Sequence, residues 1–232
     1  MQSDLQANLA TLRQRIEHAA AAAGRDPEEV KLVAVSKTHP AEIVQNAISV
    51  GITVFGENKV QEAEDKIALV GRNAAEWHLI GHLQQNKARK AVQLFDVIHS
   101  VDSVELAARL ERICIDEGRK PLGVFVQVDL AGEGTKSGIS ENDLPELVAY
   151  MKTCKRLRFN GLMVLPPFFD DPEATRPFFK RLRTIRDGLV SGDVFANGYG
   201  ELSMGMSHDF GTAVEEGATV LRVGTAIFGE RQ

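Results

Sequence analysis

The chain has 232 residues, of which 44% are hydrophobic and 25% charged, and its formal net charge is -5. This length allows one or two domains, and the composition is ordinary for a soluble globular protein. A negative net charge gives no basic footprint for a nucleic-acid backbone, and no apolar run approaches the ~20 residues that span a bilayer. We therefore expect neither a nucleic-acid partner nor a membrane partner.

The N-terminus and the cysteines bear on the location of the protein. The first residues, Met1-Gln2-Ser3-Asp4, lack the basic region and apolar stretch of a secretory signal. Cys114 and Cys154 fall in helical patterns without CxxC spacing, which is typical of thiols in a reducing compartment. A cytoplasmic location is the expectation.

The first predicted element is a helix that precedes every strand. Leu5, Leu9, Leu12 and Ile16 recur at helical spacing, and Gly24 follows at the position where helices prefer to end. This helix is therefore an N-terminal addition to whatever the strands build.

Eight short apolar runs then alternate with amphipathic stretches. The runs cover residues 31–37, 53–58, 77–83, 97–101, 123–130, 161–165, 202–206 and 220–223, and the third and seventh are the weakest. Most are continuously apolar, as expected for parallel strands covered by helices on their outer face. Glycines such as Gly51 and Gly71 end the intervening helices, and Ser103 and Ser140 precede others as caps.

Repeated strand–helix units predict a parallel sheet, and eight of them favour closure into a single α/β domain, a (β/α)₈ TIM barrel over residues 1–232. The alternative is an open, doubly wound sheet. That fold predicts a glycine-rich turn after the first strand, whereas the segment Ser36-Lys37-Thr38-His39-Pro40 contains no glycine.

Lys37 is the most informative single residue for function. It follows the first predicted strand, and barrel active sites form at the carboxyl ends of the strands. Partial desolvation there favours the neutral amine, which is the form that attacks an aldehyde. The position alone leaves open a second interpretation, a strand-end lysine that extends into solvent.

The last two predicted strands are followed by segments suited to a phosphate group. Gly224 and Thr225 follow the eighth strand, and Ser203 and Ser207 flank Gly205 around the seventh. Loops after strands seven and eight of such barrels often hold phosphate at a short extra helix. Arg222, on the eighth strand, carries donors only, so it could contact a pyridine nitrogen and keep it unprotonated.

Six spaced motifs now support a resemblance. They are Ala34-Val35-Ser36-Lys37-Thr38, Phe55-Gly56-Glu57-Asn58, Trp77-His78-Leu79-Ile80-Gly81-His82-Leu83-Gln84, Lys136-Ser137-Gly138, Ser203-Met204-Gly205-Met206-Ser207 and Arg222-Val223-Gly224-Thr225-Ala226-Ile227-Phe228-Gly229. In this order, over nearly the whole chain, they resemble the YggS/PROSC family of pyridoxal-phosphate homeostasis proteins. That family has the barrel of fold-type III enzymes, similar to the N-terminal domain of alanine racemase.

The resemblance implies roles for seven residues and a cofactor, pyridoxal 5′-phosphate (PLP). Lys37 matches the lysine that forms the Schiff base, and Arg222 matches the partner of the pyridine nitrogen. Asn58 matches a residue beside the cofactor. Ser203, Gly224 and Thr225 match phosphate contacts, with Ser207 a further candidate.

Other polar candidates carry weaker signals. No histidine spacing predicts a metal site, and His78 and His82 are expected to be structural because the residues between them form a strand pattern. The pair His208-Asp209 is typical of a helix start. Lys136, in the glycine-rich segment 132–138, is expected in solvent, with a transient second cofactor contact as the alternative.

Two functions of different class remain. One is a PLP-binding homeostasis protein without catalysis, a monomer whose partners are PLP and PLP-dependent apo-enzymes that receive it. The other is a PLP-dependent amino-acid racemase. Because the eighth predicted strand is followed by only a few residues, up to Gln232, we expect no second, β-rich domain, and Tyr150 and Tyr199 are not placed as a second base. We therefore expect no catalytic residue for the opposite face of the cofactor, and favour the homeostasis function.

Overall fold

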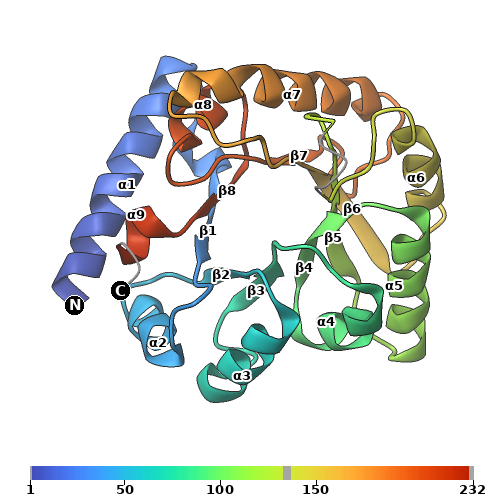
Figure 1. Cartoon of the computed structure of the whole chain (residues 1–232), viewed down its shortest axis with the longest axis horizontal. Coiled ribbons are helices and arrows are strands. Elements are labelled where there is room, and N and C mark those ends of the chain that lie inside the picture. The colour runs from blue at the N-terminus through green and yellow to red at the C-terminus, as the bar shows by residue number, and fades with distance from the viewer. Residues whose placement is uncertain (1, 133–136, 230–232) are drawn as a thin grey trace.

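Eight parallel strands close into a barrel in the order of the sequence (Figure 1). The computed structural model describes residues 2–132 and 137–229. Its strands are β1 (Lys31–Val35), β2 (Val54–Glu57), β3 (Glu76–Leu79), β4 (Val97–Val101), β5 (Leu122–Gln127), β6 (Leu157–Met163), β7 (Glu201–Ser203) and β8 (Val220–Val223). Pairing of β1 with β8, from Lys31 opposite Val220 to Ala34 opposite Val223, completes the circle. The predicted (β/α)₈ barrel is confirmed, and the open sheet is excluded.

The strands at the future site are shorter than predicted. β1 ends at Val35, so Lys37 lies in a turn, and β3 ends at Leu79, so His82 lies beyond the strand. At the end of β1 the backbone amide of Ser36 still reaches the carbonyl of Gly56 on β2, at 3.1 Å. Beyond this backbone bond, the Ser36 side chain donates a hydrogen bond to the Glu57 carboxylate on β2.

Helices surround the barrel (Figure 1). They are α1 (Gln2–Ala22), α2 (Ala41–Ser49), α3 (Val60–Val70), α4 (Ala88–Leu94), α5 (Val104–Asp116), α6 (Leu144–Met151), α7 (Arg176–Val190), α8 (Phe210–Glu215) and α9 (Thr225–Phe228), with short 3₁₀ turns at Pro27–Glu29, Gln85–Lys87 and Pro172–Thr175. The extra helix α1 packs on α8 and α9, where the Asn8 side chain donates to the Ile227 carbonyl at 3.0 Å. Within the described ranges, no helix combines the length and apolar character needed to cross a membrane.

The core has two parts. The larger part lies between the barrel and its helices and includes the fully buried Trp77, Phe95 and Phe179. The smaller part is a cluster contributed by five strands, formed by Val33, Val97, Phe125, Met163 and Val220. Because these side chains come from strands all around the circle and meet one another, they fill the inside of the barrel. Polar side chains share that interior, and they matter for the site described next.

Candidate functional site

A pocket of about 430 Å³ opens where the strands end, and we call it the mouth pocket. Six of the seven predicted cofactor-binding residues line it: Lys37, Asn58, Ser207, Arg222, Gly224 and Thr225. They come from segments that follow β1, β2, β7 and β8, and from β8 itself. The closed barrel therefore brings together residues that are up to 188 positions apart, Lys37 and Thr225. Ser203, the seventh, is not among the lining residues.

The turn that carries Lys37 is tied to a buried ion pair. Lys66 of α3 lies 2.5 Å from the Glu57 carboxylate, and the two side chains are 4% and 0% exposed. The Ser36 hydroxyl donates to the same carboxylate at 2.6 Å, and the Lys66 ammonium donates to the Ser36 carbonyl at 2.8 Å. Burial raises the pKa of Glu57, opposed by the Lys66 charge. Two contacts to this ion pair thus fix Ser36, the residue directly before Lys37.

The residue directly after Lys37 is held as well. The backbone amide of Thr38 donates to the Glu62 carboxylate, which also lies 3.2 Å from the Lys66 ammonium. Thr38 has a φ of 68°, in the left-handed region that β-branched residues rarely occupy. Such backbone strain persists only where surrounding contacts over-determine it. Lys37 is therefore presented by a turn anchored on both sides.

Arg222 is a buried cation at the pocket wall. It is 3% exposed, its Nη1 donates to the Ser203 hydroxyl at 2.6 Å, and its Nη2 donates to the Val164 carbonyl at 2.9 Å. Burial lowers the pKa of Arg222 to about 10, partly opposed by the charge of Asp209. The guanidinium therefore keeps its proton at neutral pH, and it has further N–H groups besides those two bonds.

Ser203 occupies a supporting position behind Arg222. It is the last residue of β7 and fully buried, and its hydroxyl lies 2.8 Å from Nδ1 of His99 as well as beside Arg222. The resemblance implied a phosphate contact at this residue, but the structure places its hydroxyl between two protein side chains. Ser203 thus contributes to the pocket through Arg222 in this arrangement.

The loops after β7 and β8 meet at Ser207. Its hydroxyl accepts the backbone amides of Gly224 and Ala226, each at 3.3 Å. These bonds are long for N–H donors, which usually lie near 2.9–3.0 Å from their acceptors. A side chain at Gly224 would place its Cβ 3.1 Å from the Val35 carbonyl, so the close approach of β1 favours glycine here. Exposed Thr225 adds a hydroxyl next to these amides.

Three histidines also line the mouth pocket, namely His39, His82 and His208. His82 lies half-exposed beyond the end of β3, 3.7 Å from the Asp102 carboxylate, so the prediction that it belongs to a strand is wrong. The prediction that His208-Asp209 marks a helix start is confirmed, since Asp209 precedes α8 and accepts the Met206 amide at 2.6 Å. These three imidazoles are titratable side chains that the sequence pattern did not place at the pocket. Single-sequence spacing gave no means to see that three separate loops converge there.

The remaining candidates lie elsewhere. Tyr150 belongs to α6, and Tyr199 lies in the loop before β7, so neither tyrosine lines the mouth pocket. Lys136 lies outside the described residues. The residues between 2 and 132 and between 137 and 229 contain no group of three His, Cys, Asp or Glu side chains arranged to hold a metal ion.

The sequence did not show that two pairs of polar residues support the pocket from within the protein. The pair Glu57 and Lys66 is nine positions apart, and His99 and His78 come from adjacent strands. A charged residue within the apolar strand pattern of β2 was the available signal for Glu57, and a histidine in the apolar run Val97–Val101 was the signal for His99. Buried polar residues in such runs need hydrogen-bond partners, and the partners lie on other helices and strands that only the folded structure brings near.

Comparison with known proteins places this barrel in a class. Residues 7–232 match the model of the alanine racemase N-terminal domain family. Alanine racemase from Corynebacterium glutamicum shares the fold, with a TM-score of 0.69 at 16% identity; the alignment covers 99% of this chain and 62% of that one. The class is therefore the barrel of fold-type III proteins.

More similar relatives narrow the class. A pyridoxal phosphate homeostasis protein from Pseudomonas aeruginosa is 43% identical over 99% of this chain and 96% of its own length. One from Aquifex aeolicus is 39% identical over 97% of each. The structure of PipY from Synechococcus elongatus PCC7942 with PLP bound has a TM-score of 0.85 at 40% identity, covering 97% of this chain and all of that one. The chain belongs to the family of pyridoxal phosphate homeostasis proteins.

Proposed function

We propose that the chain binds PLP in the mouth pocket, with Lys37 as the residue that forms the Schiff base, and acts in PLP homeostasis in the cytoplasm. One observation carries the proposal: Lys37, Arg222 and the donor-rich loops at Gly224 and Thr225 line one pocket of about 430 Å³. Relatives at about 40% identity are named for PLP homeostasis, and PipY is known with PLP bound.

The residues present fit the three parts of PLP. An aldehyde needs an amine, which Lys37 offers from a turn anchored on both sides. A phosphate needs several donors, which the amides of Gly224 and Ala226, held by long bonds to Ser207, and the Thr225 hydroxyl supply. A pyridine nitrogen needs one partner, and Arg222 is a buried donor without an ion pair among the described residues. Asn58 completes the lining beside these groups.

Arg222 favours holding the cofactor over reacting with it. When bound, PLP stabilises negative charge at the carbon next to an amino group through its ring. That capacity is greatest when the ring nitrogen is protonated, and an arginine there donates a hydrogen bond without giving up its proton. We infer that the useful act of this protein is to bind PLP and release it, with PLP-dependent apo-enzymes as recipients. We infer a monomer as the working form.

The second candidate is an amino-acid racemase of fold-type III. The three pocket histidines favour it, because a racemase needs an acid or base on each side of the reacting carbon. Incubation with L-alanine or L-serine in deuterated water separates the two functions. We expect no substantial α-deuteration and no D-isomer by chiral chromatography. Turnover at rates typical of enzymes, about 1–10³ s⁻¹, would establish the racemase instead.

The Schiff base is tested by the absorption spectrum of the PLP-loaded protein before and after borohydride. We expect a band near the visible edge that reduction removes, and a reduced adduct that peptide mapping assigns to Lys37. Lys37→Ala should lose the adduct completely and keep only non-covalent binding. Lys180→Ala, which changes an exposed lysine on α7, is the matched control and should behave as the parent. An adduct found only on another lysine contradicts the proposal.

A further inference from the structure

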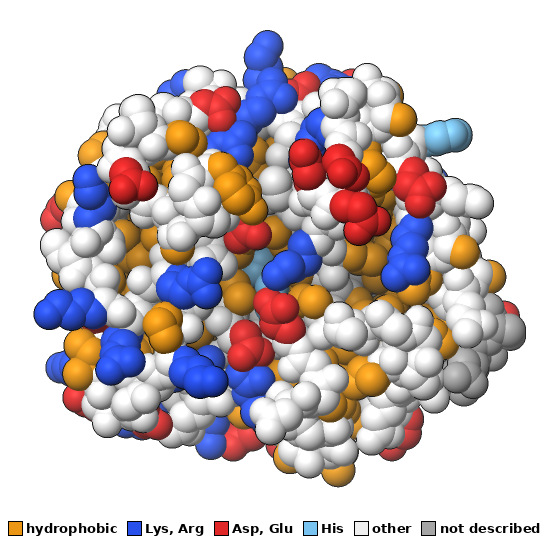
Figure 2. Space-filling model, turned by 180° about the vertical axis from the view of Figure 1, so that it is seen from behind, with side chains coloured by type: hydrophobic (Ala, Val, Ile, Leu, Met, Phe, Trp, Pro, Cys, Tyr) orange, Lys and Arg blue, Asp and Glu red, His pale blue; other side chains and the backbone are white. Residues whose placement is uncertain are grey.

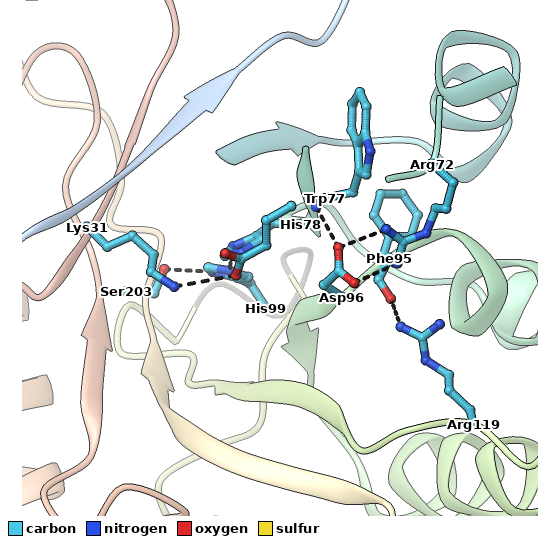
Figure 3. Close-up of polar contacts among 10 residues, drawn as sticks. Lys31, Arg72, Trp77, His78, Phe95, Asp96, His99, Arg119 and Ser203 are labelled. Carbon is cyan, nitrogen blue, oxygen red and sulfur yellow. Dashed lines mark hydrogen bonds and ion pairs between the residues drawn. The ribbon is translucent and has the colours of Figure 1, made fainter. Parts of the chain in front are cut away.

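A continuous chain of hydrogen bonds runs through the barrel from the mouth pocket toward the opposite end. Arg222 contacts Ser203 at 2.6 Å, and the Ser203 hydroxyl lies 2.8 Å from Nδ1 of His99. Nε2 of His99 lies 2.8 Å from Nδ1 of His78, whose Nε2 lies 2.8 Å from the Glu76 carboxylate. Figure 3 shows the part from Ser203 to Lys31, which approaches Glu76 at 3.4 Å. The chain thus links β8, β7, β4 and β3.

The chain is shielded from solvent over most of its length. Ser203 and His99 are 0% exposed, and His78 is 1% exposed. The His99 ring also stacks on Phe125 with 4.4 Å between ring centroids. Each ring nitrogen must therefore find its partner within the chain, because an unmet hydrogen-bonding group is costly at such depth. No buried side-chain nitrogen or oxygen of this chain of hydrogen bonds is left without a partner in the part of the protein that the structure describes.

The two ends of the chain dictate its direction. Arg222 can only donate, and an ionised Glu76 can only accept. His78 must then carry its hydrogen on Nε2, facing Glu76, and if neutral it accepts on Nδ1. His99 in turn donates from Nε2 and accepts on Nδ1, so the Ser203 hydroxyl donates to His99.

This direction leaves Ser203 in one state. Its hydrogen is committed to His99, so its oxygen presents lone pairs to Arg222. A proton added to His78 would reverse the bond to His99 and make His99 donate to Ser203. Ser203 would then accept from both neighbours, and its own hydrogen would lose a buried acceptor. Burial lowers the pKa of both His78 and His99, which favours the neutral arrangement.

We propose that Glu76, at the N-terminal end of the barrel, is a positioning residue for the mouth pocket: it fixes the tautomers of His78 and His99, and through Ser203 it orients Arg222. The hydrogen-bond direction does not depend on the proposed function; only the identity of the ligand that Arg222 contacts, PLP, rests on it. Glu76 lies beside Lys31 and Glu201, in a polar hollow of about 780 Å³ that we call the N-terminal hollow. The hydrogen-bonding state of Glu76, and not of the hollow as a whole, is therefore transmitted to Arg222.

The charged groups around the chain support its polarity. The hydrogen bond from His78, with a smaller contribution from Lys31, keeps the pKa of Glu76 low, at about 2, against the effect of burial. His78 is further influenced by Asp96, and His99 by the nearby Arg222 charge. At the other end Asp209 is the carboxylate that acts on Arg222. A negative end at Glu76 and a positive end at Arg222 both favour the same donor direction.

The test measures the tautomers directly, on the full chain without cofactor. Nitrogen-15 chemical shifts of the imidazole rings distinguish Nε2–H, Nδ1–H and charged forms, and signals are assigned with His78→Gln and His99→Gln. At neutral pH we expect His78 and His99 to be neutral with the hydrogen on Nε2. A charged ring, or a hydrogen on Nδ1 in either residue, overturns the inference, and this outcome needs no variant.

Variants then separate positioning from general structure. Glu76→Gln keeps the shape but can donate as well as accept, so His78 and His99 should show mixed tautomers. In the PLP-loaded protein, the same change should weaken PLP retention by about 2- to 30-fold, the range of coupling through such networks, and shift the absorption band. Glu201→Gln is the matched control, a carboxylate of the same hollow outside the chain, and it should change neither readout.

The outcomes distinguish this inference from the proposed function. Equal effects of Glu76→Gln and Glu201→Gln overturn the positioning role, whatever the ligand. If the tautomers are as expected but no adduct forms on Lys37, only the proposed function fails. If the adduct forms on Lys37 but Glu76→Gln changes neither tautomers nor retention, only the positioning role fails.

Discussion

The two ends of the barrel each carry a hollow and an ion pair, and they differ in what those charges do. At the mouth, the pair Lys66–Glu57 is almost fully buried and bonds to the turn that presents Lys37. At the N-terminal end, Arg72 and Asp96 form a two-pronged pair with distances of 2.6 and 3.0 Å, about one-third exposed (Figure 3). Figure 2, from behind relative to Figure 1, shows acidic and basic side chains around a central depression.

The two hollows differ in volume and in how their charges are paired. The N-terminal hollow, about 780 Å³, is larger than the mouth pocket, about 430 Å³. Two of its cations, Arg72 and Lys31, are paired with carboxylates, and a third, Arg119, donates to the Phe95 carbonyl. Arg222 at the mouth has hydroxyl and carbonyl partners only, among the described residues. Charged donors with unused capacity suit a ligand, and matched charges suit stability, as is usual for the two faces of such barrels.

The largest effect is expected from Lys66→Met at the mouth. The change leaves the Glu57 carboxylate buried without its cation, which typically costs about 3–5 kcal/mol of unfolding free energy. It also removes the Lys66 bond to the Ser36 carbonyl, so the turn at Lys37 loosens. We expect lower stability in urea denaturation and a smaller fraction of reduced PLP adduct on Lys37.

A second change shows whether the charge is responsible. Glu57→Gln in the Lys66→Met background removes the uncompensated carboxylate, so much of the lost stability should return. The adduct fraction should recover less, because Lys66 still cannot bond to Ser36. No recovery of stability in the double variant would show that packing, and not charge, dominates at this site.

The comparison of the two ends also shows what could be predicted from the sequence. Eight apolar runs at regular spacing identified every strand, because a strand covered on both faces must be apolar throughout. Lys37, Arg222, Gly224 and Thr225 could be selected as candidates because strand ends and turn residues are local features. Their convergence on one pocket follows from closure of the barrel, which the number of strands predicted.

The supporting residues could not be predicted because their partners are distant in sequence. In the sequence, Ser203 stands two residues before Gly205, which is typical of a loop that binds phosphate. In the structure it is the last residue of β7, paired with β6 and β8, and its hydroxyl lies against Arg222 and His99. The apolar run predicted His82 to lie in a strand. In the structure β3 ends at Leu79, so His82 lies beyond it and is half-exposed at the mouth. The direction in which a side chain points at a strand end depends on where the strand ends. The ends of strands are the part of a fold that sequence patterns predict least reliably.

Acid should lower the free energy of unfolding through the buried histidines His78 and His99, and exposed histidines should not contribute in the same way. Burial lowers the pKa of His78 and His99, whereas the unfolded chain binds protons on both below about pH 6.5. Stability is therefore lost as the pH falls below that value, by about 1.4 kcal/mol per pH unit for each histidine that stays neutral. The Glu76 carboxylate, with a pKa of about 2, adds its own loss only below about pH 4.5.

The measurement is the unfolding free energy between pH 7 and pH 5. His99→Gln should reduce the slope in this window, and His18→Gln, which changes an exposed histidine on α1, should leave it as it is. Identical slopes for all three proteins would show that the buried histidines do not account for the acid sensitivity.

A smaller effect is expected at the phosphate end of the mouth pocket. Thr225→Val removes one hydroxyl donor, and a hydrogen bond to a charged group contributes about 1.5–3 kcal/mol. PLP retention should weaken about tenfold or more, while pyridoxal, which lacks the phosphate, should bind nearly as before. Titration followed by absorbance measures both ligands. Equal weakening of the two would place the phosphate away from Thr225.

The smallest effect is expected from Arg72→Ala at the N-terminal end. The Arg72–Asp96 pair is partly exposed, and ion pairs in contact with solvent contribute about 0–1 kcal/mol, so the unfolding free energy should fall by about that amount. Asp96 keeps one backbone partner, the Trp77 amide at 2.9 Å, which limits the loss. Because Arg72 does not belong to the chain between Glu76 and Arg222, PLP retention and the absorption band should be unchanged.

Arg222→Ala, the matched arginine at the mouth, should instead shift the band and weaken retention. If Arg72→Ala altered the band as strongly as Arg222→Ala, the division of the barrel into a ligand end and a stabilising end would be wrong.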